Sequence, residues 1–325
     1  MSCYHPLKAL KIGYRGDGKE ALKIVPYDSI EEFKPDGSKY DFYTIPCGKC
    51  IGCRQDQSAE WSNRLLLESL YHDKTFFLTL TYDNDHLHPV LRVKPNTGEI
   101  VDGATLSKRD WQLFMKSLRN EFPDAKIRFY AAGEYGPRSC RPHIHSILFG
   151  LPLDDSELIP FGKSETGDPY YICPRLQSIW NRGNISIEPA NYYTFKYVSS
   201  YVTSKVGRYP NDYWKKQNLE PPFALMSRKP GIGSQYLIDH PEIMENDRIV
   251  ISLETGAVEF PPPRYFRKSF KEVFPDDYQV AADRHQKKAN DKRDAEMIRT
   301  DKEYIDYLKV KESEHYAKMK ERKSF

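Results

Sequence analysis

The sequence contains no long hydrophobic run. None of its apolar stretches approaches the roughly 20 residues that a helix needs to cross a bilayer. The first residues, Met1 to Pro6, lack the apolar region of a secretion signal. We therefore expect a protein of a reducing, cytoplasmic compartment that has no membrane partner.

The sequence also lacks an excess of charge of one sign. Its 49 Lys and Arg residues and 46 Asp and Glu residues give a formal net charge of +3. A uniformly basic protein is excluded, so any nucleic-acid site must be a local patch. With 325 residues, 39% of them hydrophobic and 13% aromatic, the chain can form a core and still spare rings for contacts with bases.

Two histidines stand two residues apart in the segment 141–150. Pro142 precedes them and the apolar run Ile147-Leu148-Phe149 follows, which predicts a strand. Residues i and i+2 of a strand lie on one face, so His143 and His145 project side by side. Two imidazoles on one strand form half of a divalent-metal site, although a bare His-x-His pair is usually two surface residues.

A carboxylate precedes this strand in the sequence. Residues 126–134 predict another strand, which ends at Glu134. The turn-rich loop 136–139 predicts a hairpin that places Glu134 antiparallel to the histidine strand. Glu134, His143 and His145 would then supply one oxygen and two nitrogens to a metal. By ligand chemistry alone, Zn²⁺ or Mn²⁺ suits such a site as well as Mg²⁺.

Three tyrosines recur at helical spacing downstream. Residues 191–206 predict a helix, and the spacing of Tyr193, Tyr197 and Tyr201 places their rings on one face. Such a helix is more often core than catalytic, but the metal ligands nearby favour a nucleophile. Tyr197 and Tyr201 lie one turn apart, so both can face one metal, and we assign Tyr193 to packing.

Basic residues follow the tyrosines, with aromatic rings between them and few acids. Such a run suits single-stranded DNA, with phosphates at the charges and bases on the rings, although a solvated loop explains any one residue equally well. The residues are Lys196, Lys205, Arg208, Tyr209, Tyr213, Trp214, Lys215, Lys216, Arg228 and Lys229.

Three of the six cysteines are clustered. Cys47, Cys50 and Cys53 are separated by two residues each, with glycines between them that permit a tight turn. The pattern resembles a zinc knuckle whose fourth ligand is Cys3 or His5. The alternative is reduced thiols without a metal, because half a knuckle is less specific than two paired halves.

The remaining segments predict an α+β fold. A strand, a helix and two further strands follow in order, which suits an antiparallel sheet with helices on one face, the ferredoxin-like arrangement. The other face would be free for metal and DNA. The expected helices are 54–72 and 107–122; the expected strands are 76–82, 126–134 and 143–149; residues 1–53 are expected to be irregular, 151–170 a polar loop and 281–325 a charged helix.

The ordered set of motifs resembles a known family. Gly133-Glu134-Tyr135-Gly136, the strand at 141–145 and the segment 197–205 look like those of HUH endonucleases. More narrowly, the chain is similar to the rolling-circle replication initiators of gokushovirus-type microviruses, which are small single-stranded DNA phages. The similarity extends to residues 45–54, 77–82 and 226–233, and to about the proline run at 261–263.

The resemblance implies a metal-dependent enzyme that nicks the viral origin. Its metal, Mg²⁺ or Mn²⁺, would be held by Glu134, His143 and His145, and the nucleophiles would be Tyr197 and Tyr201. The products would be a 5′-phosphotyrosine adduct and a free 3′-hydroxyl, with later strand rejoining. The implied partners are single-stranded and origin DNA and the host replication machinery, helicase and polymerase, in the bacterial cytoplasm.

The sequence departs from the family at one position. Related initiators carry a basic residue between the two tyrosines, where this chain has Ser200. Lys205 matches a later basic position of the family and is the basic residue expected to assist catalysis. Two alternatives stay open: a metal-dependent phosphodiesterase that uses water, and a non-catalytic nucleic-acid-binding module.

The resemblance and the composition together suggest four segments. These are a Cys-containing N-terminal segment with the zinc knuckle (1–60), an endonuclease domain (61–240), a Pro-rich extension (241–280) and a charged helical tail (281–325).

Overall fold

The computed structural model describes residues 3–93, 97–136, 139–163, 167–204, 212–244, 248–253, 256–300 and 303–321. The chain divides into two units: Ser58–Pro275, and Met1–Gln57 together with Asp276–Phe325. The first and last predicted segments therefore belong largely to one unit. No helix within the described ranges is long and apolar enough to span a membrane.

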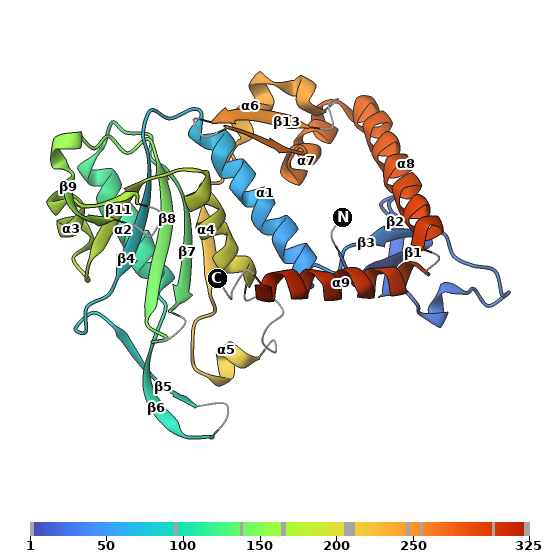
Figure 1. Ribbon diagram of the computed structural model, residues 1–325, viewed down its shortest axis with the longest axis horizontal. Helices are drawn as coiled ribbons and strands as arrows, with labels where there is room; N and C mark the ends of the chain where they lie inside the picture. Colours follow the sequence, from blue (N-terminus) through green and yellow to red (C-terminus); the bar gives the residue numbers. More distant parts are fainter. Residues whose placement is uncertain are drawn as a thin grey trace. The chain divides into compact units, whose positions relative to one another are not determined.

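A seven-stranded antiparallel sheet forms the centre of the larger unit (Figure 1). The predicted strands are confirmed, and β4 is buried along most of its length because its residues are apolar or β-branched. In spatial order the strands are β12 (Phe223–Met226), β7 (Arg128–Tyr135), β8 (Pro142–Phe149), β4 (Thr75–Thr81), β11 (Ile185–Pro189), β10 (Pro169–Ile172) and β9 (Ile159–Lys163).

The middle of the sheet has the ferredoxin-like strand order. The helix α2 (Lys108–Glu121) follows β4, and α3 (Pro174–Trp180) follows β8, so the chain runs β4-α2-β7-β8-α3-β11. Ser107 caps α2 by accepting the Asp110 N–H at 3.2 Å, as predicted. Both helices bury apolar side chains in one core with the strands: Trp111, Phe114, Met115, Leu118, Leu176 and Trp180.

The prediction of helices on one face only is wrong. The helix α4 (Tyr192–Ser204) packs against β7 and β8. It also packs on α1 (Ile51–Ser69) through small side chains, since Ser199 Oγ lies 2.8 Å from Ser62 Oγ and 3.0 Å from Ser58 Oγ. This packing could not be anticipated, because serines at a helix contact resemble surface residues. The face with the histidines is therefore partly covered by a helix.

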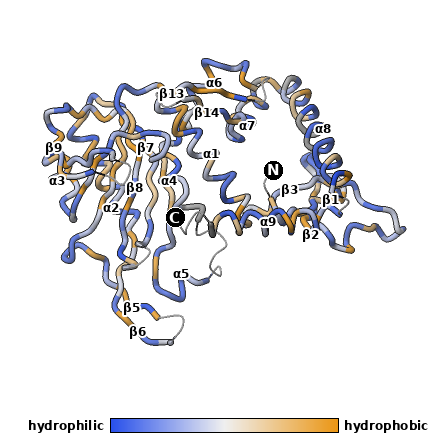
Figure 2. Tube along the Cα trace, viewed as in Figure 1, coloured by the Kyte–Doolittle hydropathy of each residue, from blue (hydrophilic) through white to orange (hydrophobic). Residues whose placement is uncertain are grey.

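The N-terminal segment is also more ordered than predicted. Residues expected to be irregular form the sheet β2 (Glu20–Pro26), β1 (Leu7–Tyr14) and β3 (Phe42–Ile45), with the 3-10 turn η1 (Ile30–Glu32) in the connection between β2 and β3. The same unit contains α8 (Pro275–Thr300), hydrophilic along most of its length in Figure 2, and α9 (Tyr304–Glu321). The predicted charged helix is thus two helices, and Tyr304 contacts Tyr27 with ring centroids 5.4 Å apart.

Smaller elements complete the larger unit. β5 (His88–Val93) and β6 (Ile100–Thr105) form the hairpin predicted in that region, and β13 (Ile249–Leu253) pairs with β14 (Gly256–Phe260). The remaining elements are η2 (Asp155–Glu157), α5 (Tyr213–Lys216), α6 (Ser234–Asp239), η3 (Pro241–Met244) and α7 (Arg264–Val273).

Candidate metal and nucleophile site

The sheet register brings the predicted metal ligands together. Glu134 on β7 is directly opposite His143 on β8, and Thr79 on β4 is opposite His145. Alternation along each strand places all four side chains on the face that α4 covers. The hairpin prediction from the sequence is therefore confirmed in its register.

The three ligand atoms lie close enough to share one ion. Glu134 Oε1 is 2.9 Å from His143 Nε2 and 3.8 Å from His145 Nε2. The carboxylate and His145 are buried, and His143 is partly buried. A buried carboxylate between two imidazoles is a donor set for a divalent cation.

A second layer of hydrogen bonds orients both imidazoles. His143 Nδ1–H donates to the Arg141 carbonyl at 3.2 Å, and His145 Nδ1 lies 2.9 Å from Thr79 Oγ1. A neutral imidazole carries one N–H, so His143 Nε2 presents a lone pair to the carboxylate only 2.9 Å away. Two acceptors at this distance require a cation or a shared proton, so the residues fit a metal ion.

The buried imidazole is held in its metal-binding form. Burial, and then the neighbouring His143, lower the pKa of His145 well below 6.5. The neutral ring keeps its Nε2 lone pair at neutral pH, which a metal ligand requires.

Both predicted nucleophiles contact this site. The rings of Tyr197 and Tyr201 lie 5.4 and 4.8 Å from the His145 ring, and the Tyr201 ring is stacked on it at 6°. The two tyrosine rings are 4.7 Å apart. The helical spacing therefore places two phenols beside one metal ligand, as the sequence predicted.

The two phenols differ in acidity. Burial raises the pKa of Tyr197, and a hydrogen bond from Tyr201 partly offsets this by stabilising the Tyr197 phenolate. Burial raises the pKa of Tyr201 far above its usual value, and the same hydrogen bond raises it further. Neither phenol is ionised at neutral pH, so attack requires activation, and Tyr197 is the easier of the two to ionise.

The other predicted residues have mixed outcomes. Lys205, Arg208 and Tyr209 lie outside the described residues. Tyr193 was predicted to be a packing residue, which is wrong, because 62% of its surface is exposed and it lines a cavity. A single helical face can place one ring on the sheet and leave another, one turn earlier, beyond its edge.

A cavity of about 520 Å³ opens beside the tyrosines. His145 and Tyr197 line one side of it, and Glu188 of β11 and the edge strands line the other. Sequence reasoning missed Glu188. The alternation Ile185-Ser186-Ile187-Glu188 could have placed it on the polar face, but the position of β11 next to β4 was not predictable from it.

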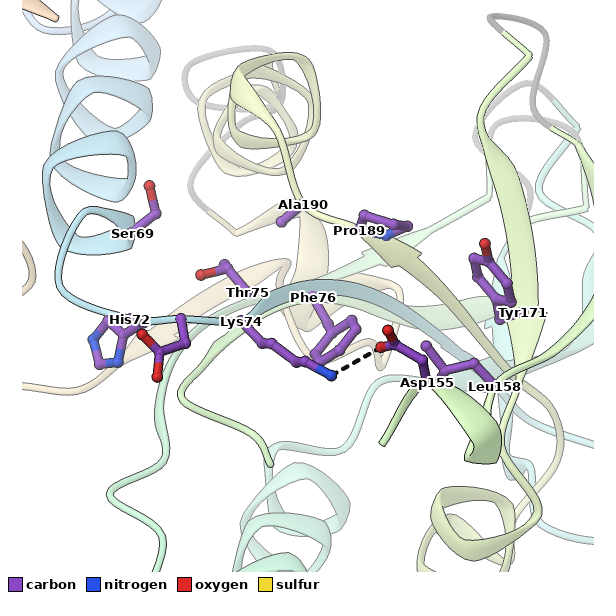
Figure 3. Close-up of a pocket in the computed structure, with 11 residues that line it drawn as sticks. Ser69, His72, Lys74, Thr75, Phe76, Asp155, Leu158, Tyr171, Pro189 and Ala190 are labelled. Carbon is purple, nitrogen blue, oxygen red and sulfur yellow. Dashed lines mark hydrogen bonds and ion pairs between the residues drawn. The ribbon is translucent and has the colours of Figure 1, made fainter. Parts of the chain in front are cut away.

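Another cavity, of about 600 Å³, lies at the opposite end of β4 (Figure 3). Thr75 and Phe76, the first residues of the strand, line it. Lys74 Nζ donates to the Leu153 carbonyl and to the Asp155 carboxylate, both at 2.8 Å. Because two acceptors satisfy this ammonium group and the histidines lie at the far end of the strand, we assign this cavity no role in the site.

The four predicted cysteines converge in the smaller unit. The Sγ atoms of Cys3, Cys47, Cys50 and Cys53 all lie within 4.8 Å of one another. Cys47–Cys53 and Cys3–Cys50 sulfurs are each 3.9 Å apart. His5, the alternative fourth ligand, instead pairs with Glu312 at 2.8 Å.

Backbone N–H groups point at these sulfurs. The Cys50 N–H donates to Cys47 Sγ at 3.3 Å, the Cys47 N–H to Cys3 Sγ at 3.3 Å and the Tyr4 N–H to Cys50 Sγ at 3.4 Å. Burial acts to raise the pKa of Cys50, but N–H donors and neighbouring thiols bring it down to about 7. Burial raises the pKa of Cys3 to about 11.

The chain is similar to replication-associated proteins of small phages. It is 31% identical over 319 residues to replication-associated protein ORF2 of Spiroplasma virus 4, covering 95% of this chain and 93% of that protein. It is 27% identical to replication-associated protein VP4 of Bdellovibrio phage phiMH2K, over 85% of this chain and 79% of that protein. It is 28% identical to replication-associated protein ORF4 of Chlamydia phage 1, over 79% and 61%.

A family model agrees with these relatives. The model for the family of replication-associated protein ORF2 matches residues 75–206, which include the histidine strand and the tyrosine helix. No solved structure matches the chain.

Proposed function

Because this chain belongs to the rolling-circle replication initiators of microviruses, we propose that it nicks single-stranded origin DNA with a tyrosine nucleophile. The observation that carries the proposal is the contact of Tyr197 and Tyr201 with His145, one of three convergent ligands. The sheet and its two covering helices would serve as the palm of an HUH endonuclease.

Glu134, His143 and His145 would hold the divalent cation, Mg²⁺ or Mn²⁺ by family resemblance. When bound, the ion withdraws charge from the scissile phosphate and leaves coordination positions for its oxygens. Thr79 and the Arg141 carbonyl fix the imidazole orientations, so the ligands need little rearrangement to bind.

The chemical step conserves the energy of the phosphodiester. The hydroxyl oxygen of a tyrosine attacks phosphorus, its proton passes to solvent, and the bond from phosphorus to the 3′ oxygen breaks. That oxygen takes up a proton and becomes a free 3′-hydroxyl, while the 5′ phosphate remains on tyrosine. Reversal of the step rejoins strands without ATP, and the free hydroxyl would prime a host polymerase behind a host helicase in the bacterial cytoplasm.

Two tyrosines allow two such steps in one chain. Replication needs one cut to open the origin and another to cut the regenerated origin while the first adduct persists. The hydrogen bond that Tyr201 donates favours Tyr197 as the first nucleophile, because it stabilises the phenolate. Lys205 would supply the basic assistance for which the family uses this position, since Ser200 cannot.

Incubation with a labelled single-stranded oligonucleotide carrying the viral origin and Mn²⁺ tests the proposal. Denaturing gels should show a protein-linked labelled fragment and a released strand with a free 3′-hydroxyl. A water-using phosphodiesterase would give cleavage without an adduct, and a non-catalytic binding module would retain the DNA intact.

We also propose that the four cysteines hold a structural zinc ion. Zinc–sulfur bonds of about 2.3 Å place sulfurs of a tetrahedron roughly 3.8 Å apart, close to the two separations of 3.9 Å here. The N–H donors partly neutralise the thiolates. The site would join the N-terminus to α1, and the hydroxyl of Tyr4, adjacent to Cys3, lies 2.8 Å from His315 Nδ1 of α9. Metal binding would therefore also order the contact with α9.

A further inference from the structure

The cavity beside the tyrosines has a composition unlike that of a phosphate-binding site. It shares His145 and Tyr197 with the candidate metal and nucleophile site. Its opposite wall carries two carboxylates, Glu188 and Asp168, and it has no Lys or Arg among the lining residues that the structure describes. Such a wall repels phosphate, so the cavity suits an uncharged or amine-bearing part of a ligand.

Glu188 is the polar group that most needs a partner there. Only 8% of its surface is exposed, and within the described ranges it forms no hydrogen bond or ion pair. Burial, and then Asp168, raise the pKa of its carboxyl group to about 7. A buried carboxyl group without a partner costs free energy, which a ligand with N–H donors would recover.

Aromatic rings line the same cavity. Phe161 and Tyr170 stack on one another with centroids 6.0 Å apart, and Phe77 forms part of the floor against His145, 5.5 Å away. Exposed rings at a cavity mouth bind flat π-systems by stacking. The volume of about 520 Å³ falls in the usual range of small-ligand sites, about 300–1,000 Å³.

The cavity also lies at the right separation from the metal ligands. Glu188 is two strands across from His145 and two residues further along the sheet. Strand spacings then put the two Cα atoms roughly 12 Å apart. An adjoining cavity of about 710 Å³ shares Thr79, Phe161 and Ser186 with this one, so the groove continues for neighbouring nucleotides.

We propose that this cavity binds one nucleobase of the DNA near the cleaved bond, and that Glu188 selects a base with an amino group. Adenine, cytosine and guanine offer such an N–H donor, and thymine does not. Phe161 and Tyr170 would stack on the base. This inference rests on the proposed function, and it adds the part of the substrate that determines sequence preference.

A binding selection from a random single-stranded DNA library, made with the full chain, tests the proposal without requiring cleavage. The wild type should enrich amino-bearing bases over thymine at one position, by a factor on the order of tenfold. Glu188→Ala should abolish that preference and leave other positions unchanged. Glu188→Gln should reduce it and admit thymine, because an amide also donates.

Asp155→Ala is the matched control, since it removes a carboxylate from the cavity of Figure 3 and should preserve the enriched base. Thermal unfolding shows whether each variant is folded, and Glu188→Gln carries the test if the alanine variant is not. An unchanged preference in the Glu188 variants, or a wild type without any base preference, would overturn the inference.

The selected DNA, incubated with Mn²⁺, separates this inference from the proposed function. Base selection without a covalent adduct would leave the cavity assignment intact and refute the tyrosine mechanism. Adduct formation with an unaltered base preference in Glu188→Ala would refute only the cavity assignment.

Discussion

Thr79→Val should weaken metal binding without disturbing DNA binding. The Thr79 hydroxyl lies 2.9 Å from His145 Nδ1, and His145 is buried. Valine has nearly the same shape but leaves Nδ1 without a partner. Losing a buried hydrogen bond in this way costs about 1–3 kcal/mol, which is consistent with the roughly 10- to 100-fold loss of affinity typical when a partner of a metal-ligating histidine is removed.

The assay is a Mn²⁺ titration of the single-turnover rate of adduct formation. The Mn²⁺ concentration that gives the half-maximal rate should rise by about 10- to 100-fold in Thr79→Val. The rate at saturating Mn²⁺ should change much less, because both ligand nitrogens and both tyrosines remain. Affinity for an uncleaved oligonucleotide, measured by fluorescence anisotropy, should stay near the wild-type value.

Thr81→Val is the matched control on the same strand and face. Its hydroxyl donates to the Asn184 carbonyl at 3.3 Å and does not contact a metal ligand. This variant should require the same Mn²⁺ concentration as the wild type. Equal Mn²⁺ dependence in Thr79→Val and Thr81→Val would refute the orienting role of Thr79.

Three further predictions follow from the same geometry. His143→Ala or His145→Ala should abolish cleavage while DNA binding, supplied mainly by phosphate contacts, persists and falls with salt; full activity of the double variant in Mn²⁺ would exclude the site. Tyr197→Phe and Tyr201→Phe should each retain some single-round cleavage, whereas the double variant should form no adduct; unit-length circle release by either single variant would contradict the two-tyrosine scheme. Reduced, freshly purified protein should contain about one zinc per chain, and Cys50→Ser should lower that content and expose α9 to hydrogen exchange; zinc-free protein with a protected α9 would exclude the knuckle.

The local geometry of the candidate site was predictable because it follows from two periodicities. The two-residue repeat of a strand places His143 and His145 on one face, and the turn after Glu134 sets the hairpin register. The helical repeat aligns Tyr197 with Tyr201. Each of these relations involves residues close in sequence, so no knowledge of the rest of the fold was needed.

The missed features depend on contacts between distant segments. The strands β9 and β10 are short and contain Pro160, Gly162 and Pro169, so the segment resembled a polar loop. The alternation of β1 is broken by an irregularity between Lys11 and Gly13, which concealed the N-terminal sheet. Glu188 acquired its significance only from the placement of β11 beside β4.

The position of α4 was unpredictable for a similar reason. Its contact with α1 uses Ser58, Ser62 and Ser199, which have no hydrophobic periodicity. Periodicity therefore identified the helix and its tyrosines but not the sheet face that the helix covers.

Peptide mapping of the protein–DNA adduct tests the central claim most directly. The wild type is incubated with origin-containing single-stranded DNA and Mn²⁺, digested with nuclease and protease, and the modified peptide is sequenced by mass spectrometry. We expect the 5′ phosphate on Tyr197 or Tyr201, with Tyr197 modified first at short times. An adduct on Tyr193 or Tyr192, or cleavage with no tyrosine adduct at all, would contradict the proposed function.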